Sequence, residues 1–162
     1  MTTVYLVRHA KALDRHAWVE PDELRPLSKA GLRQAEALAT HLDDGTLSRL
    51  VSSPHARCTQ TLEPLSARLG APIEVADELA EGASGRGALE LVRSLAVDGP
   101  LVACSHGDVL LDALAELRAA GVTLGGPLEC KKGSTWALEL DAGSFGRGRY
   151  LKPPATDKAE AS

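Results

Sequence analysis

The sequence contains few aromatic residues and few cysteines, and it has no long apolar run. Only 3% of its 162 residues are aromatic, so leucine, valine and alanine must build the core. The cysteines Cys58, Cys104 and Cys130 are odd in number and widely spaced, which excludes a disulfide framework and a CxxC metal site. They indicate a reducing compartment. Because no segment resembles a secretion signal or a membrane span, we expect a cytoplasmic protein without a membrane partner.

The charge balance also lacks any excess of basic residues. There are 18 Lys and Arg against 22 Asp and Glu, which gives a formal net charge of −4. We therefore expect no nucleic-acid partner. The length suits one domain with a full core, which we place at 1–152, followed by a disordered tail at 153–162. The sequence leaves the oligomeric state open.

Segments with strand-like and helix-like patterns alternate along the chain. The predicted strands lie at 3–8, 50–52, 73–75 and 101–104, with a late hairpin at 135–140 and 145–151. The predicted helices lie at 28–43, with Ser28 as N-cap, at 61–69, ended by Gly70, and at 88–97 and 109–117. Residues 76–87 hold three glycines and read as a loop. This alternation predicts a three-layer α/β/α sandwich around a mostly parallel sheet.

Arginine and histidine follow three of the predicted strands. Arg8 and His9 end the first strand, Arg57 follows the second, and His106 follows the fourth. In a parallel sheet these strand ends meet at one edge, where open α/β sheets bind their ligands. Arginine forks match phosphate oxygens, and the helix that begins beyond His106 adds backbone amides. We therefore predict a phosphate site.

Histidine beside a bound phosphate suits nucleophilic catalysis. A neutral imidazole is available near pH 7, and a phosphohistidine intermediate splits hydrolysis into two displacements. The arginines and the second histidine would neutralise charge on the phosphoryl oxygens. This chemistry needs no metal and no cofactor. A metal site at His9 and His106 is disfavoured because the neighbouring arginines would repel a divalent cation.

Three motifs together resemble those of the histidine phosphatase superfamily, which includes the phosphoglycerate mutases. They are Leu6-Val7-Arg8-His9-Ala10, with Ala10 where Gly is usual, Ser-Pro-x-x-Arg-x-x-Gln-Thr at 53–61, and Ser105-His106-Gly107. The resemblance implies a phosphoglycerate mutase-like fold. It also implies that His9 is the phosphorylated nucleophile, that Arg8 and Arg57 bind the phosphate, and that His106 completes the pocket.

The resemblance also suggests a general acid. Many members carry an acidic residue in a Leu-x-Glu pattern, and Leu79-Ala80-Glu81 supplies one here. Glu81 is thus the candidate that protonates the leaving oxygen and later activates water. Glu78 lies close by in sequence and is the alternative carboxylate, and either could be a solvated loop residue.

The loop after Val75 is too short for the insertion found in mutases, which favours an open site. The length and the segment 24–31 resemble the compact SixA-type phosphohistidine phosphatases. The segments 8–12, 60–65 and 78–82 resemble the phosphatase half of actinobacterial Nudix-fusion proteins. Phosphomonoesters such as sugar phosphates, phosphohistidine on proteins, and nucleotide-type phosphates are therefore all candidate substrates. Selectivity is expected in the loops 10–27 and 76–87.

Further basic residues could contact a second phosphate or an acidic substrate group. Lys11 and Arg25 lie within or beside the motifs, and Arg15 and Arg86 are further candidates, although such residues are commonly solvated. The sequence leaves three functions open: a hydrolase, a phosphomutase, and a non-catalytic phosphate-binding module. The remaining histidines, cysteines and tryptophans considered are interpreted as structural or surface residues: His16, His41, His55, Cys58, Cys104, Trp18 and Trp136. Trp18 lies in the loop after the first motif and could also rim the pocket.

Overall fold

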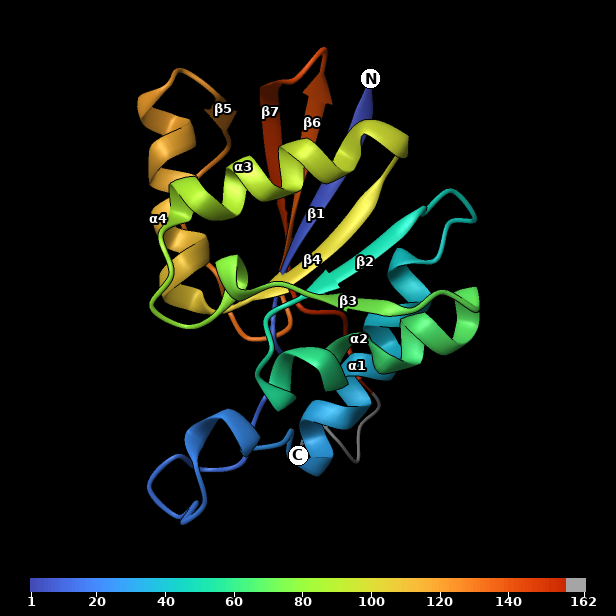
Figure 1. Cartoon of the computed structure of the whole chain (residues 1–162), viewed down its shortest axis with the longest axis vertical. Coiled ribbons are helices and arrows are strands. Elements are labelled where there is room, and N and C mark those ends of the chain that lie inside the picture. Colours follow the sequence, from blue (N-terminus) through green and yellow to red (C-terminus); the bar gives the residue numbers. More distant parts are fainter. Residues whose placement is uncertain (157–162) are drawn as a thin grey trace.

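The computed structural model describes residues 1–156 and shows one β-sheet between two pairs of α-helices (Figure 1). The strands are β1 Thr2–Arg8, β2 Arg49–Ser52, β3 Ile73–Val75, β4 Leu101–Ser105, β5 Thr123–Leu124, β6 Thr135–Asp141 and β7 Ser144–Leu151. The α-helices are α1 Lys29–Leu42, α2 Ala56–Leu69, α3 Gly85–Leu95 and α4 Gly107–Ala119. Short 3-10 helices span Asp22–Leu24, Asp77–Leu79 and Ala96–Asp98.

The seven strands are ordered β3-β2-β4-β1-β6-β7-β5. The first four are mutually parallel, β6 runs antiparallel to both β1 and β7, and β5 runs parallel to β7. Arg8 pairs with Ser105, and Ser52 pairs with Cys104, so β1, β4 and β2 end at nearly the same level. This architecture confirms the predicted α/β/α sandwich.

The two faces of the sheet carry separate apolar clusters because successive strand side chains point to opposite sides. Leu101 and Ala103 of β4 pack in the cluster that includes α3 and α4. Val102 and Cys104 of the same strand pack in the cluster that includes α1 and α2. Figure 1 shows the strands running between these helix pairs. Parallel strands covered on both faces explain why β4 is apolar at every position from Leu101 to Cys104.

Local capping fixes the helix ends that the sequence pattern suggests. The Oγ of Ser28 accepts a hydrogen bond from the Gly31 amide at the start of α1, as expected for an N-cap. Helix α2 ends at Gly70, whose φ of 65° is the left-handed conformation that glycine adopts without strain. Both predicted boundaries are confirmed.

The elements differ from the prediction at the start of α3 and in one additional strand. Helix α3 begins at Gly85, three residues before the predicted start at 88, because Ser84 caps it by accepting from the Gly87 amide. A Cβ on Gly85 would lie 2.2 Å from the Ala113 amide nitrogen, so glycine here lets α3 cross α4 closely. The short strand β5 was not predicted. Residues 152–156 have no regular secondary structure, and the rest of the predicted tail, 157–162, lies outside the described residues.

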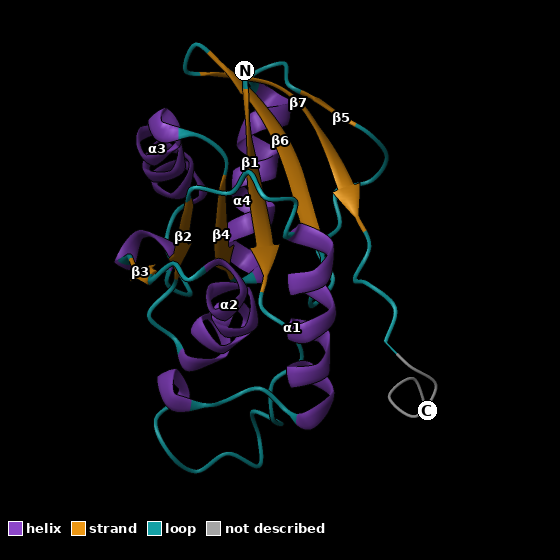
Figure 2. Cartoon of the chain, turned by 90° about the vertical axis from the view of Figure 1, so that its right-hand side faces the viewer, coloured by secondary structure: helices purple, strands orange, loops and turns teal. Residues whose placement is uncertain are grey.

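A long loop between β1 and α1 extends past the carboxyl ends of the parallel strands. Figure 2 shows it below the arrowhead of β1, on the side opposite the N-terminus. An isolated bridge between Ala12 and Leu27 closes its base, and the 3-10 helix Asp22–Leu24 lies within it. None of the helices within residues 1–156 has the length and apolar character needed to cross a bilayer.

Candidate active site

The carboxyl ends of β1 and β4 open onto a cavity of about 590 Å³. Its wall combines the strand ends, the loop after β1 and the segment before β6. Its lining residues include Arg8, His9, Glu81, His106, Gly107 and Lys132. The structure thus brings together predicted site residues that are up to about a hundred positions apart in the sequence.

His9 presents one ring nitrogen to this cavity in a fixed tautomer. Its Nδ1 lies 2.8 Å from the carbonyl oxygen of Ala10, and a carbonyl can only accept, so Nδ1 carries the proton. The Nε2 lone pair is therefore available. The pKa of His9 is lowered to about 3, mainly by burial and further by the nearby His106, Arg57 and Arg8, against the opposing effect of the Ala10 hydrogen bond. His9 is a neutral imidazole at physiological pH.

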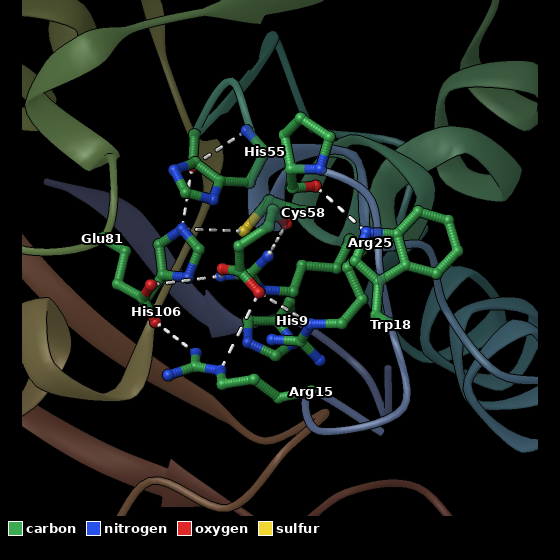
Figure 3. A network of polar contacts seen from close by, with 12 residues as sticks. His9, Arg15, Trp18, Arg25, His55, Cys58, Glu81 and His106 are labelled. Atoms are coloured by element: carbon green, nitrogen blue, oxygen red, sulfur yellow. Dashed lines mark hydrogen bonds and ion pairs between the residues drawn. The ribbon is translucent and has the colours of Figure 1, made fainter. Parts of the chain in front are cut away.

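His106 lies beside His9, with ring centroids 5.4 Å apart in an edge-on arrangement. Its Nε2 lies 2.9 Å from the Ser53 hydroxyl, which also accepts a hydrogen bond from the His55 amide. Ser53 can then donate to Nε2, and this assignment leaves a proton on His106 Nδ1. The Cys58 thiol is a second neighbour, 3.5 Å from the same nitrogen (Figure 3).

Arg8 is held against the start of α4. Its Nη1 donates to the carbonyl of Cys130 at 2.7 Å. A Cβ on Gly107 would lie 2.9 Å from Arg8 Cζ, so the glycine at the first position of α4 makes room for the guanidinium. This contact explains a glycine in the third motif by local geometry.

Arg57 is completely buried and contacts two carboxylates. Its Nη1 donates to the backbone carbonyl of Asp22 at 2.9 Å and its Nη2 to Asp22 Oδ2 at 3.0 Å. Glu81 Oε2 lies 3.4 Å from the same Nη2. A buried arginine requires such partners. Carboxylate oxygens on a guanidinium mark positions that phosphoryl oxygens can also occupy.

Four buried nitrogens of the side chains at this site have no hydrogen-bond partner among the described residues. One is His55 Nδ1, and the other three are Arg8 Nε, Arg57 Nε and His106 Nδ1. Buried polar groups are normally paired, and unpaired ones call for an explanation. These last three belong to side chains whose charge or ring lies close enough to His9 to lower its pKa. Donors grouped around a neutral imidazole are suited to an anion.

Glu81 lies on the cavity wall and is hydrogen-bonded to Arg15 Nη2 at 2.9 Å (Figure 3). Partial burial raises the pKa of Glu81, but the Arg15 hydrogen bond and the charges of Arg15, Arg57 and His106 outweigh it, so the net pKa is lowered. The carboxylate is therefore ionised before a ligand binds. Glu78, the alternative carboxylate, does not line this cavity.

The other predicted residues divide into those on the cavity and those away from it. Lys11 and Arg15 line it, as does Arg25, whose guanidinium is buried and donates to Leu13 O and Asp22 Oδ1. Arg86 does not line it and pairs with Glu116 at 3.3 Å, so its position gives no support to a role at a second phosphate. Trp18 also lies outside the cavity lining, with its Nε1 donating to Pro21 O.

Sequence reasoning missed several residues that contact this site. Asp22 and Ser53 have no pattern that separates them from ordinary loop residues, although Ser53 opens the second motif. Lys132 lies in a segment before β6 that no motif covers. His55 was interpreted as a structural or surface residue. It is buried, with its ring centroid 4.7 Å from that of His106.

The site has no arrangement typical of a bound metal. Within residues 1–156, no group of three or more His, Cys, Asp or Glu side chains is placed to hold a metal ion. The cations Arg8 and Arg57 lie beside the two histidines instead. The donor set is one for an anion, by its charge and by its hydrogen-bonding groups.

Comparison with known proteins agrees with this geometry. Residues 4–89 match the histidine phosphatase superfamily (branch 1). An 8-oxo-(d)GTP phosphatase from Mycolicibacterium smegmatis is 33% identical over 160 residues, covering 94% of this chain but only 48% of the relative. The chain thus spans about half the length of that relative.

Solved structures share the fold. The protein histidine phosphatase SixA, in complex with tungstate, superimposes with a TM-score of 0.74 at 24% identity, over 93% of this chain and 97% of that chain. A SixA-type protein from Agrobacterium tumefaciens gives a TM-score of 0.66 at 28% identity, over 86% of this chain and 92% of that chain. The match across more than half of the chain, together with the fold, shows that this chain belongs to the histidine phosphatase superfamily.

Proposed function

We propose that this chain is a phosphatase that works through a phosphohistidine intermediate on His9. One observation carries the proposal: a neutral imidazole with a free Nε2 lies beside three buried, unpartnered N–H donors. Arg8 and His106 line the cavity together with His9, whereas Arg57 does not line it and contacts Glu81 of its wall. A nucleophile and donors for the phosphoryl oxygens are the two requirements of phosphoryl transfer through a covalent intermediate.

The proposed reaction has two displacements. His9 Nε2 attacks phosphorus, a P–N bond forms, and the bond from phosphorus to the leaving oxygen breaks with its electron pair on that oxygen. Water then attacks the phosphohistidine, a P–O bond forms, and the P–N bond breaks to return the pair to Nε2. Arg8, Arg57 and His106 Nδ1 stabilise charge on the phosphoryl oxygens in both steps.

Glu81 is the proposed proton carrier. It would protonate the leaving oxygen in the first step and take a proton from water in the second. A phosphate on Arg57 competes with Glu81 for the same guanidinium, which lies 3.4 Å from Glu81 Oε2. Loss of that attraction raises the pKa of Glu81 toward the range of a general acid.

Two substrate classes have support from relatives. The SixA structure is of a protein histidine phosphatase, and the mycobacterial relative is a phosphatase of 8-oxo-(d)GTP. We therefore propose phosphoprotein or nucleotide-type phosphates, with simple phosphomonoesters as substrates that need only the core site. The cysteines among the described residues are buried and free, which supports a reducing compartment such as the cytoplasm.

The direct test measures phosphate release from p-nitrophenyl phosphate in excess chelator. The wild-type protein should turn over, and acid-sensitive, alkali-stable phosphoryl label should be trapped on the chain after rapid quenching. His9→Ala should abolish both signals without changing the thermal unfolding profile. His41→Ala, an exposed histidine on α1, is the matched control and should behave as wild type.

The outcome distinguishes the open alternatives. Undiminished turnover by His9→Ala would exclude His9 as the nucleophile. Trapped label without net phosphate release would favour a phosphomutase. Phosphate binding without label or turnover would indicate a non-catalytic module.

A further inference from the structure

Two lysines on the cavity wall have no carboxylate partner. Lys11 lies in the loop after β1, and Lys132 lies in the segment before β6. Both residues line the cavity that contains His9. Among residues 1–156, neither ammonium group lies within 4.0 Å of a carboxylate. The neighbouring cations differ, because Arg15 pairs with Glu81 at 2.9 Å and Arg25 with Asp22 at 2.9 Å.

The carboxylates of the cavity wall are also committed elsewhere. Asp108 Oδ2 accepts from the Gly82 amide at 2.9 Å, and Asp14 Oδ1 accepts from the His16 amide at 2.9 Å. Glu81 is held by Arg15. The wall therefore carries five Lys and Arg side chains against three Asp and Glu side chains, and neither lysine is ion-paired with any of the three.

One side chain fixes both lysine-bearing segments. Gln34 of α1 accepts a hydrogen bond from the Lys11 amide at 2.8 Å through Oε1, and its Nε2 donates to the Lys132 carbonyl at 3.5 Å. The Lys11 carbonyl in turn accepts from the Ser28 amide at 2.9 Å. The backbone positions of the two cations are thus set by the fold, although the ammonium groups themselves are exposed.

Holding these cations together has an electrostatic cost. Partial burial of Lys132 lowers its pKa, and the charges of Arg8, Arg25, Lys11 and Arg15 lower it further. Cations in excess on one wall destabilise one another, and a bound anion reduces that repulsion. Arg8 lies close enough to both Lys132 and His9 to lower their pKa values, so the lysines adjoin the proposed phosphoryl site.

We infer that Lys11 and Lys132 form a second anion subsite, and that the preferred substrate is an organic diphosphate whose terminal phosphoryl group His9 attacks. This inference rests on the proposed function and adds a substrate class to it. In the first displacement the bond between the terminal phosphorus and the bridging oxygen breaks. The leaving organic monophosphate keeps the electron pair and receives a proton, and water later releases phosphate from His9. The lysines hold the phosphate that leaves with the organic group.

The kinetic test compares GDP with GMP as substrates. The wild-type kcat/KM should be higher for GDP, and the ratio of GDP to GMP should fall about tenfold in the double variant Lys11→Gln/Lys132→Gln, as expected for two partly exposed ion pairs. Each single variant should give part of that change. Lys131→Gln is the matched control, since this lysine is adjacent in sequence but does not line the cavity, and its ratio should equal that of wild type.

A binding test avoids catalysis. By calorimetry, imidodiphosphate should bind the wild-type protein more tightly than inorganic phosphate, and the double variant should lose that difference. Equal kcat/KM for GDP and GMP in the wild type, or an unchanged ratio in the double variant, would overturn the inference. Failure of p-nitrophenyl phosphate hydrolysis would instead overturn the proposed function, so the two failures are distinguishable.

Discussion

The carboxylate of Asp22 accepts a hydrogen bond from the fully buried guanidinium of Arg57 at 3.0 Å. Its other oxygen accepts from Arg25 Nε at 2.9 Å. A single acidic residue of the loop after β1 therefore connects two buried arginines, one of which is a proposed phosphate ligand. This connection ties the loop that shapes the cavity to helix α2.

Replacing this carboxylate should destabilise the protein. Asp22→Asn keeps the side-chain shape but removes the charge that compensates buried Arg57. We expect the free energy of unfolding to fall by about 2 kcal/mol, which is less than the loss for a fully buried ion pair because Asp22 is partly exposed. Chemical denaturation measures this free energy. Glu74→Gln, which breaks the more exposed Arg49 pair, is the control and should cost less than about 1 kcal/mol. Equal losses would contradict a special role for Asp22.

The protonation of His9 should make stability depend on pH. Its pKa is about 3 when folded and about 6.5 in an unfolded chain. Between these values the unfolded state binds the extra proton, so the contribution of His9 is fully present above pH 6.5 and is lost as the pH falls toward 3. His9→Gln should reduce the slope of unfolding free energy against pH in this window by about 1 kcal/mol per pH unit. An unchanged slope would show that His9 titrates normally.

The role of Glu81 should depend on the leaving group. Glu81→Gln cannot donate a proton, so kcat/KM for an alkyl phosphate, which reports the first displacement and not the hydrolysis of phosphohistidine, should fall by about a hundredfold. The loss should be smaller for p-nitrophenyl phosphate, because p-nitrophenolate leaves without protonation. Steady-state kinetics on both substrates measures this difference, and Glu78→Gln should match wild type. The same loss on both substrates would argue that Glu81 only positions Arg57 or Arg15.

Gly107 should control the position of Arg8. A Cβ there would lie 2.9 Å from Arg8 Cζ, so Gly107→Ala should push the guanidinium aside and raise KM for p-nitrophenyl phosphate by about tenfold. The helix itself should tolerate alanine, so the melting temperature should not fall. Gly146→Ala is the control, since its Cβ would meet no atom within 4 Å. An unchanged KM would mean that Arg8 has another equally good position.

The local sequence predicted most elements because their signals are local. Ser28 caps α1 and Gly70 ends α2 through contacts within a few residues of each helix end. The start of α3 was missed because Gly85 disfavours a helix by itself. The close crossing with Ala113 of α4, which makes glycine suitable there, is a tertiary contact. Strand β5 was missed because two residues carry no pattern.

The sequence by itself determined the sandwich and the residues that follow its central strands. Arg8, His9 and His106 could be found because a parallel sheet brings its carboxyl ends to one edge, so the order of strands and polar residues implies their proximity. Only the tertiary structure decided what surrounds them. The pairing of Asp22 with Arg57, the exclusion of Arg86 from the cavity, and the joining of Lys11 to Lys132 by Gln34 depend on how loops pack. Those contacts join residues distant in sequence, and no local pattern encodes them.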